Sequence, residues 1–99
     1  MPAPLLSETE IASRLPELPD WRLADDRLVR TITTRDFRSA LELVTRIADP
    51  ADAQNHHPDV AIHWNEVTLA LWTHDSGGIT ERDFRLARAI DQIVETPSD

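Results

Sequence analysis

Histidines carry the clearest chemical signal in this sequence of 99 residues. His56 and His57 are adjacent, and His74 follows after a short apolar segment and a turn. Histidine is the side chain whose ordinary pKa lets it both donate and accept a proton near neutral pH. Two imidazoles near one substrate atom would supply an acid and a base together, an effect typically worth ~10²–10⁴ in rate. The pattern therefore predicts a small acid–base active site.

The spacing of these histidines is compatible with one shared site. His56 or His57 precedes one predicted strand, and His74 follows the next, with a tight turn at Asn65-Glu66 between the two strands. An antiparallel hairpin would bring these two ends to the same edge and make them neighbours. Histidines at loop ends are also common on protein surfaces, so chance accounts for this spacing as well as a shared active site does.

Other site chemistries find less support in the sequence. Cysteine and lysine are absent, which excludes disulfides, thiolate metal ligands and Schiff bases. The histidines lack the spacings of zinc sites, so we expect no metal. Gly77-Gly78 has no accompanying phosphate-binding motif and is typical of a tight strand-to-helix turn. Ser7 and Ser76 have no neighbouring base, so nucleophilic catalysis is not supported.

Composition predicts a single soluble domain that spans residues 1–99, with 1–6 and 96–99 flexible. Apolar residues make up 40% of the chain and charged residues 28%, as in ordinary globular proteins. The net charge of −8 argues against nucleic acid as a partner. No apolar run approaches the ~20 residues of a membrane span. The lack of cysteine fits a cytoplasmic location, which we expect.

Hydrophobic periodicity predicts the elements that must position the histidines. Ser7 and Glu10 have the spacing of a capping box that begins a first helix. Two hairpins, each followed by a helix, come after it. The predicted order is a helix at 8–15, strands at 21–23 and 28–32, a helix from a Thr33 or Thr34 cap to about residue 48, strands at 60–64 and 67–73, and a Thr80-capped helix at 81–94.

This order, α-β-β-α-β-β-α, predicts a two-layer α+β fold with a four-stranded antiparallel sheet and three helices on one face. In the second helix, the inward stripe should include Phe37 and Leu41. Pro50 should end or kink the helix near Ala48-Asp49, and resumption of the helix over Ala51 to Asn55 is an alternative. Strand alternation would place Trp72 and His74 on one face, if the extended conformation persists that far. Asp83 follows Thr80 in the first turn of the last helix, where a helix cap is its simplest role.

The same residues resemble the pterin-4a-carbinolamine dehydratase family. Asp52 is followed by His56-His57-Pro58, then by the aromatic Trp64, His74 and finally Asp83, all at the spacing of the family pattern. The resemblance covers nearly the whole chain. It implies removal of water from 4a-hydroxytetrahydropterins, the products of pterin-dependent aromatic amino acid hydroxylases, to give quinonoid dihydropterin.

The resemblance also implies roles for individual residues. His56 and His74 correspond to acid–base residues, and His57 to a residue that orients the pterin. Contacts to the substrate are implied for a further set of positions, namely Asp52, Pro58, Thr73, Asp75, Trp21 and Asp83. No cofactor or metal is implied, because the pterin is itself the substrate.

Partners are implied as well: a homo-oligomer, either dimer or tetramer, and an aromatic amino acid hydroxylase as a candidate partner. An alternative is a dehydratase-like binding, assembly or regulatory module with little catalytic role. The sequence departs from the family pattern at Glu66, where a basic residue is usual, and at Thr34, where an aromatic often stands. Glu66 would change a surface contact or the electrostatic field at the mouth of the site, and so bears on partners more than on the chemistry.

Overall fold

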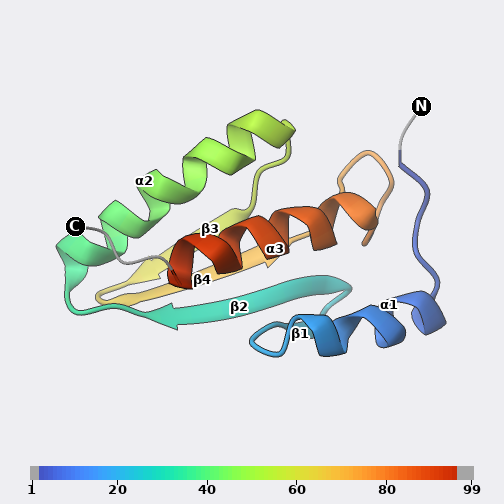
Figure 1. Cartoon of the computed structure of the whole chain (residues 1–99), viewed down its shortest axis with the longest axis horizontal. Coiled ribbons are helices and arrows are strands. Elements are labelled where there is room, and N and C mark those ends of the chain that lie inside the picture. Colours follow the sequence, from blue (N-terminus) through green and yellow to red (C-terminus); the bar gives the residue numbers. More distant parts are fainter. Residues whose placement is uncertain (1–2, 96–99) are drawn as a thin grey trace.

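The chain forms a four-stranded antiparallel sheet with helices layered on one face, as Figure 1 shows for the computed structural model. The structure describes residues 3–95. Along the chain the elements are α1 (Glu8–Arg14), the 3-10 helix η1 (Leu15–Glu17), β1 (Arg22–Ala24), β2 (Arg27–Thr33), α2 (Phe37–Gln54), β3 (Asp59–His63), β4 (Glu66–Leu71) and α3 (Glu81–Glu95). This order confirms the predicted α+β fold.

The strand order in the sheet, β1-β2-β4-β3, places the second predicted hairpin along one side of the sheet. In that hairpin His63 pairs with Glu66 at the turn, and Asp59 pairs with Ala70 near the open end. The segments that precede β3 and follow β4 therefore leave the sheet at the same end of the hairpin. The histidines His56, His57 and His74 lie in these two segments, as predicted.

The core lies between the sheet and the helices. Val67, Leu69 and Leu71 alternate along β4 and are all completely buried on the face that the helices cover. Phe84 and Ile90 of α3 are equally buried. Full burial of such a side chain stabilises the fold by roughly 1.5–3 kcal/mol, so this layer holds α3 firmly over the sheet.

The start of α2 differs from the prediction. Asp36 is the N-cap, and its carboxylate accepts a hydrogen bond from the Ser39 N–H at 2.8 Å. That backbone hydrogen bond is the main reason why the pKa of Asp36 lies below its ordinary value of 3.8. Thr34, a predicted cap, instead joins the hairpin turn, because its N–H donates to the Asn65 carbonyl at 2.7 Å.

The inward face of α2 is also displaced from the predicted stripe. Phe37 and Leu41 are 49% and 45% exposed, whereas Leu43 is buried. Pro50 lies inside a continuous helix rather than at its end. Ala51, one residue later, is only 2% exposed and belongs to the core. Packing of the last turn thus offsets the cost of a proline in the helix, which is about 3 kcal/mol.

The N-terminal segment is tied to the rest of the described chain. The predicted capping box is confirmed, because Ser7 Oγ accepts from the Glu10 N–H and Glu10 Oε1 accepts from the Ser7 N–H. The Leu6 N–H donates to the Ile79 carbonyl at 3.0 Å. The predicted flexibility at 1–6 and 96–99 stays a prediction, and 1–2 and 96–99 lie outside the described residues. Within 3–95, no helix is long and apolar enough to cross a membrane.

Candidate active site

The turn after α2 directs the first histidine into the protein. Asn55 ends the helix in the left-handed conformation, with φ 49° and ψ 45°, which asparagine tolerates better than most residues. The N–H of His56 then donates back to the Ala51 carbonyl at 3.0 Å. Arg82 of α3 holds the turn from the other side, because its Nη2 donates to the Asn55 carbonyl at 2.8 Å. The reversal turns His56 toward the start of α3.

His56 is buried and bonded to Asp83. Its side chain is 8% exposed, and Nε2 lies 2.6 Å from Oδ1 of Asp83, which is completely buried. An ionised carboxylate can only accept hydrogen bonds, so we assign the proton to Nε2. The nitrogen left for chemistry is then Nδ1. Asp83 therefore fixes both the orientation and the tautomer of the His56 ring.

Asp83 is itself held by two threonines. Its Oδ2 accepts from Thr73 Oγ1 and from the Thr80 N–H, both at 2.9 Å. Thr80 Oγ1 lies 2.7 Å from Thr73 Oγ1 and accepts from the Arg82 N–H at 3.2 Å, as the predicted helix cap should. Both Asp83 oxygens are thus occupied inside the protein, and Thr73 is 1% exposed. Asp83 and Thr73 therefore lie behind His56, and their predicted contacts with a substrate stay predictions.

His57 lies in a different environment from its neighbour. Its Nε2 is 2.9 Å from Oδ1 of Asp52 in the last turn of α2. The two side chains are 57% and 77% exposed, so water screens this pair. Pro58, the next residue, is half-buried. His57 and Asp52 therefore offer accessible polar atoms beside the buried His56–Asp83 pair.

His74 is exposed at the end of β4, stacked on a tryptophan. The ring centroids of His74 and Trp72 are 4.0 Å apart with an interplanar angle of 43°. Thr73 between them points inward to Asp83, so alternation continues past the strand and the predicted common face of Trp72 and His74 is confirmed. Asp75 is exposed next to His74.

Trp21 lies in the core. It is 5% exposed, and its Nε1 donates to Oδ1 of Asp91 on α3 at 2.7 Å. Arg30 forms an ion pair with the same oxygen. This network joins β2, α3 and the segment before β1. The predicted contact between Trp21 and a substrate stays a prediction.

The structure links the predicted residues unevenly. Asp83 connects His56 directly to Thr73, the residue before His74, so the two histidine corners meet through one carboxylate. His63 is exposed on β3 and takes no part in this network.

Asn55 and Arg82 were not predicted as parts of the site. Asn55, at the end of a helical pattern and before the histidines, carried a signal for a left-handed cap.

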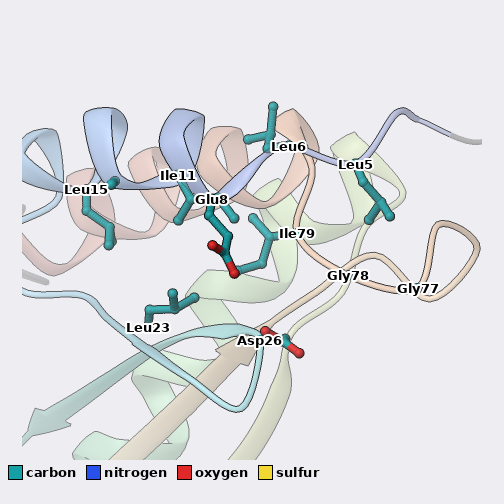
Figure 2. A pocket seen from close by; sticks show the side chains of 11 residues that line it. Leu5, Leu6, Glu8, Ile11, Leu15, Leu23, Asp26, Gly77, Gly78 and Ile79 are labelled. Atoms are coloured by element: carbon teal, nitrogen blue, oxygen red, sulfur yellow. The ribbon is translucent and has the colours of Figure 1, made fainter.

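A cavity of about 390 Å³ lies elsewhere, between α1, the β1–β2 turn and the loop after β4 (Figure 2). Apolar side chains such as Ile11, Leu15 and Ile79 form most of its wall, with the carboxylates of Glu8 and Asp26 beside them. It contains no histidine and is not the acid–base site.

Within residues 3–95, no group of three or more His, Asp or Glu side chains is arranged to hold a metal ion.

Comparisons with known proteins agree on one family. The model described as "Pterin 4 alpha carbinolamine dehydratase" matches residues 4–93. A Chloroflexus aurantiacus protein named "Putative pterin-4-alpha-carbinolamine dehydratase" is 52% identical over 91 residues, which is 92% of this chain and 98% of that protein. A Nocardia farcinica protein of the same name is 45% identical over 94 residues, 95% of this chain and 99% of that protein. The solved structure of a "transcriptional coactivator/pterin dehydratase" from Brucella melitensis superposes with a TM-score of 0.84 at 31% identity, over 89% of this chain and 96% of that one.

Proposed function

Because the chain belongs to the pterin-4a-carbinolamine dehydratase family, we propose that it removes water from 4a-hydroxytetrahydropterins to give quinonoid dihydropterins. The observation that carries the proposal is the buried His56–Asp83 pair at 2.6 Å, joined through Thr73 to the strand end that presents His74. Both histidines occupy positions of the family pattern. The pterin is the substrate, and we expect no separate cofactor or metal.

The reaction needs one proton acceptor and one proton donor. The N5 lone pair forms the C4a–N5 double bond as the C4a–O bond breaks. The leaving hydroxyl takes up a proton and departs as water, while N5 loses its own proton. The substrate therefore loses one water in total, with no oxidation or reduction.

His56 suits the role of base. With Nε2 bonded to Asp83, its Nδ1 has a lone pair that can accept the N5 proton. The buried carboxylate then stabilises the imidazolium that forms, as in other Asp–His pairs. The low local dielectric strengthens this effect.

His74 suits the role of acid. It is exposed and follows the end of β4, near the segment that carries His56. From there an imidazolium could donate a proton to the leaving oxygen. Return of the proton from His56 through water would restore both groups. We assign to His57, which lies 2.9 Å from Asp52, the role of orienting the pterin. Pro58 and Asp75, next to these histidines in the chain, would supply further contacts.

The test is stopped-flow absorbance of freshly generated 4a-carbinolamine with the wild-type protein, His56→Gln and His74→Ala. We expect each variant to lose roughly 10²-fold or more in kcat. His63→Ala is the matched control, because His63 is an exposed histidine on β3 outside the network. If wild-type protein leaves the spontaneous decay unchanged, the chain is not a dehydratase.

A second candidate function is a binding or regulatory module, with a homo-oligomeric assembly and an aromatic amino acid hydroxylase as partners, acting in the cytoplasm. Support comes from the exposed Phe37 and Leu41 on α2 and from the Brucella melitensis relative, which is described as a transcriptional coactivator as well as a pterin dehydratase. Light scattering should then give a multiple of 11.2 kDa. A stoichiometric partner retained by His74→Ala and lost by Leu41→Glu would favour this function.

A further inference from the structure

Trp72 is held by groups from two neighbouring strands, and His74 rests on it. The guanidinium carbon of Arg27 at the start of β2 lies 4.6 Å from the Trp72 ring centroid. The indole Nε1 donates to Oδ2 of Asp59 at the start of β3, at 3.2 Å. The His74 ring is 4.0 Å from the indole, centroid to centroid. A chain of contacts therefore runs from two fixed strands to an exposed histidine.

The stack accounts for the orientation of His74, which lacks the support that the other two site histidines have. His56 is bonded to Asp83 and His57 to Asp52. The His74 side chain has neither a hydrogen bond nor an ion pair with any residue between 3 and 95. Its contact with Trp72 is therefore what restrains the ring. An indole face attracts an imidazolium and also packs against neutral imidazole, so the restraint serves both protonation states.

Arg27 is positioned for this stack rather than for an ion pair. Leu28 pairs with Leu71, so the register places Arg27 beside Trp72. Its Nε is buried and has no hydrogen-bond partner within the described residues. Burying a donor without an acceptor costs free energy, although the chain carries a net charge of −8 and offers many carboxylates. The Nε of Arg27 is not bonded to any of these carboxylates, and the guanidinium instead lies over the indole ring of Trp72.

We propose that Trp72 is a positioning residue for His74, and that Arg27 and Asp59 act on the site through Trp72. The proposal rests on the proposed dehydratase function, in which His74 donates a proton to the leaving oxygen. Proton transfer requires hydrogen-bond reach to one atom, and a misplacement of 1 Å can cost ~10²-fold in rate. The indole restricts the ring before the substrate arrives.

The test compares Trp72→Ala, Trp72→Phe and Arg27→Leu by stopped-flow kinetics and NMR. Trp72→Ala should lower kcat roughly 10- to 100-fold and change KM much less. Trp72→Phe keeps an aromatic face but loses the hydrogen bond to Asp59, so it should recover only part of the loss. Arg27→Leu should fall between wild type and Trp72→Ala. Arg85→Leu, an exposed arginine on α3, is the matched control and should behave as wild type.

NMR separates positioning from general damage to the fold. The indole ring current should shift the carbon-bound ring protons of His74 upfield in the wild type, and Trp72→Ala should abolish that shift. Absence of the shift in wild type, or a folded Trp72→Ala with kcat within about twofold of wild type, overturns the proposal. Should Trp72→Ala fail to fold, Arg27→Leu decides it by the same two readouts. A wild-type protein without dehydratase activity overturns the proposed function itself.

Discussion

The carboxylate of Asp83 lies 2.6 Å from Nε2 of His56, and no part of the Asp83 side chain is exposed. His57 and Asp52 form the same kind of contact at 2.9 Å, with side chains 57% and 77% exposed. Two pairs of identical chemistry therefore stand side by side, one in the interior and one in water. The buried pair lies in a lower dielectric and is screened less by water. The carboxylate of Asp83 therefore interacts more strongly with a proton on His56 than Asp52 does with one on His57.

Asp83→Asn should lower kcat by roughly 10²-fold or more, because the tautomer of His56 changes. An amide has one oxygen, and Thr73 and Thr80 both donate toward Oδ2. If the amide oxygen faces them, its NH₂ faces Nε2 and forces the proton of His56 onto Nδ1. Stopped-flow kinetics and ¹⁵N NMR of the ring nitrogens measure the two effects together. Full activity with Nδ1 protonated would refute the assignment of Nδ1 as base.

Asp83→Ala should also destabilise the fold, by at least about 2 kcal/mol. The change leaves two donors inside the protein without an acceptor, His56 Nε2 and the Thr80 N–H, and each such group costs roughly 1–3 kcal/mol; the Thr73 hydroxyl can still donate to Thr80 Oγ1. Urea denaturation measures the loss. Asp49→Ala, an exposed aspartate on α2, is the control. A loss equal to that of the control would show that this network does not stabilise the fold.

Asn55→Ala should destabilise the protein by about 1 kcal/mol, and Asn55→Gly should be close to neutral. The residue has φ 49°, a conformation that costs an alanine roughly 1–2 kcal/mol and costs glycine little. Because Asn55 precedes His56, the alanine variant should also lower kcat. Thermal unfolding and steady-state kinetics test both effects. Equal stability of the two variants would mean that the turn relaxes to another conformation.

Asp36→Ala should destabilise the protein at neutral pH and have little effect in acid. The hydrogen bond from the Ser39 N–H lowers the pKa of Asp36 below 3.8 in the folded state. A lowered pKa stabilises the fold above the unfolded value, and the contribution is lost as the pH falls through the folded pKa. Urea midpoints of wild type and variant should therefore differ at pH 7 and converge near pH 2. A difference independent of pH would exclude the charge as the cause.

Trp21→Phe should cost about 1 kcal/mol, the usual worth of one hydrogen bond, because Nε1 no longer donates to Asp91. Denaturation measures this cost, and kinetics on the same variant test the predicted contact with the substrate. With a purely structural role for Trp21, KM stays at the wild-type value. A KM several-fold higher in the folded variant would support the predicted contact of Trp21 with the substrate.

Local sequence patterns predicted the elements well and their ends less well. The capping box at Ser7 and Glu10 depends on residues three apart, so its prediction needed no tertiary information. The predicted cap of α2 at Thr33 or Thr34 is wrong, because several polar residues precede that helix and the sequence alone does not show that Asp36 is the one that accepts from the Ser39 N–H. Helix beyond Pro50 is one of the predicted alternatives, and the sequence does not choose between them, because a local rule for proline does not include the burial of Ala51.

Hydrophobic periodicity is enough to predict the fold class, and the short spacing of the histidines is enough to predict the candidate site; the family follows from the resemblance of these residues to a known pattern. Which histidine is buried, and which carboxylate lies behind it, depends on tertiary packing. His56 and Asp83 are 27 positions apart, and burial depends on how α2, β4 and α3 pack. Strand alternation predicts that Trp72 and His74 share a face. The residues that contact the indole, Arg27 and Asp59, come from other strands, and local alternation does not predict them.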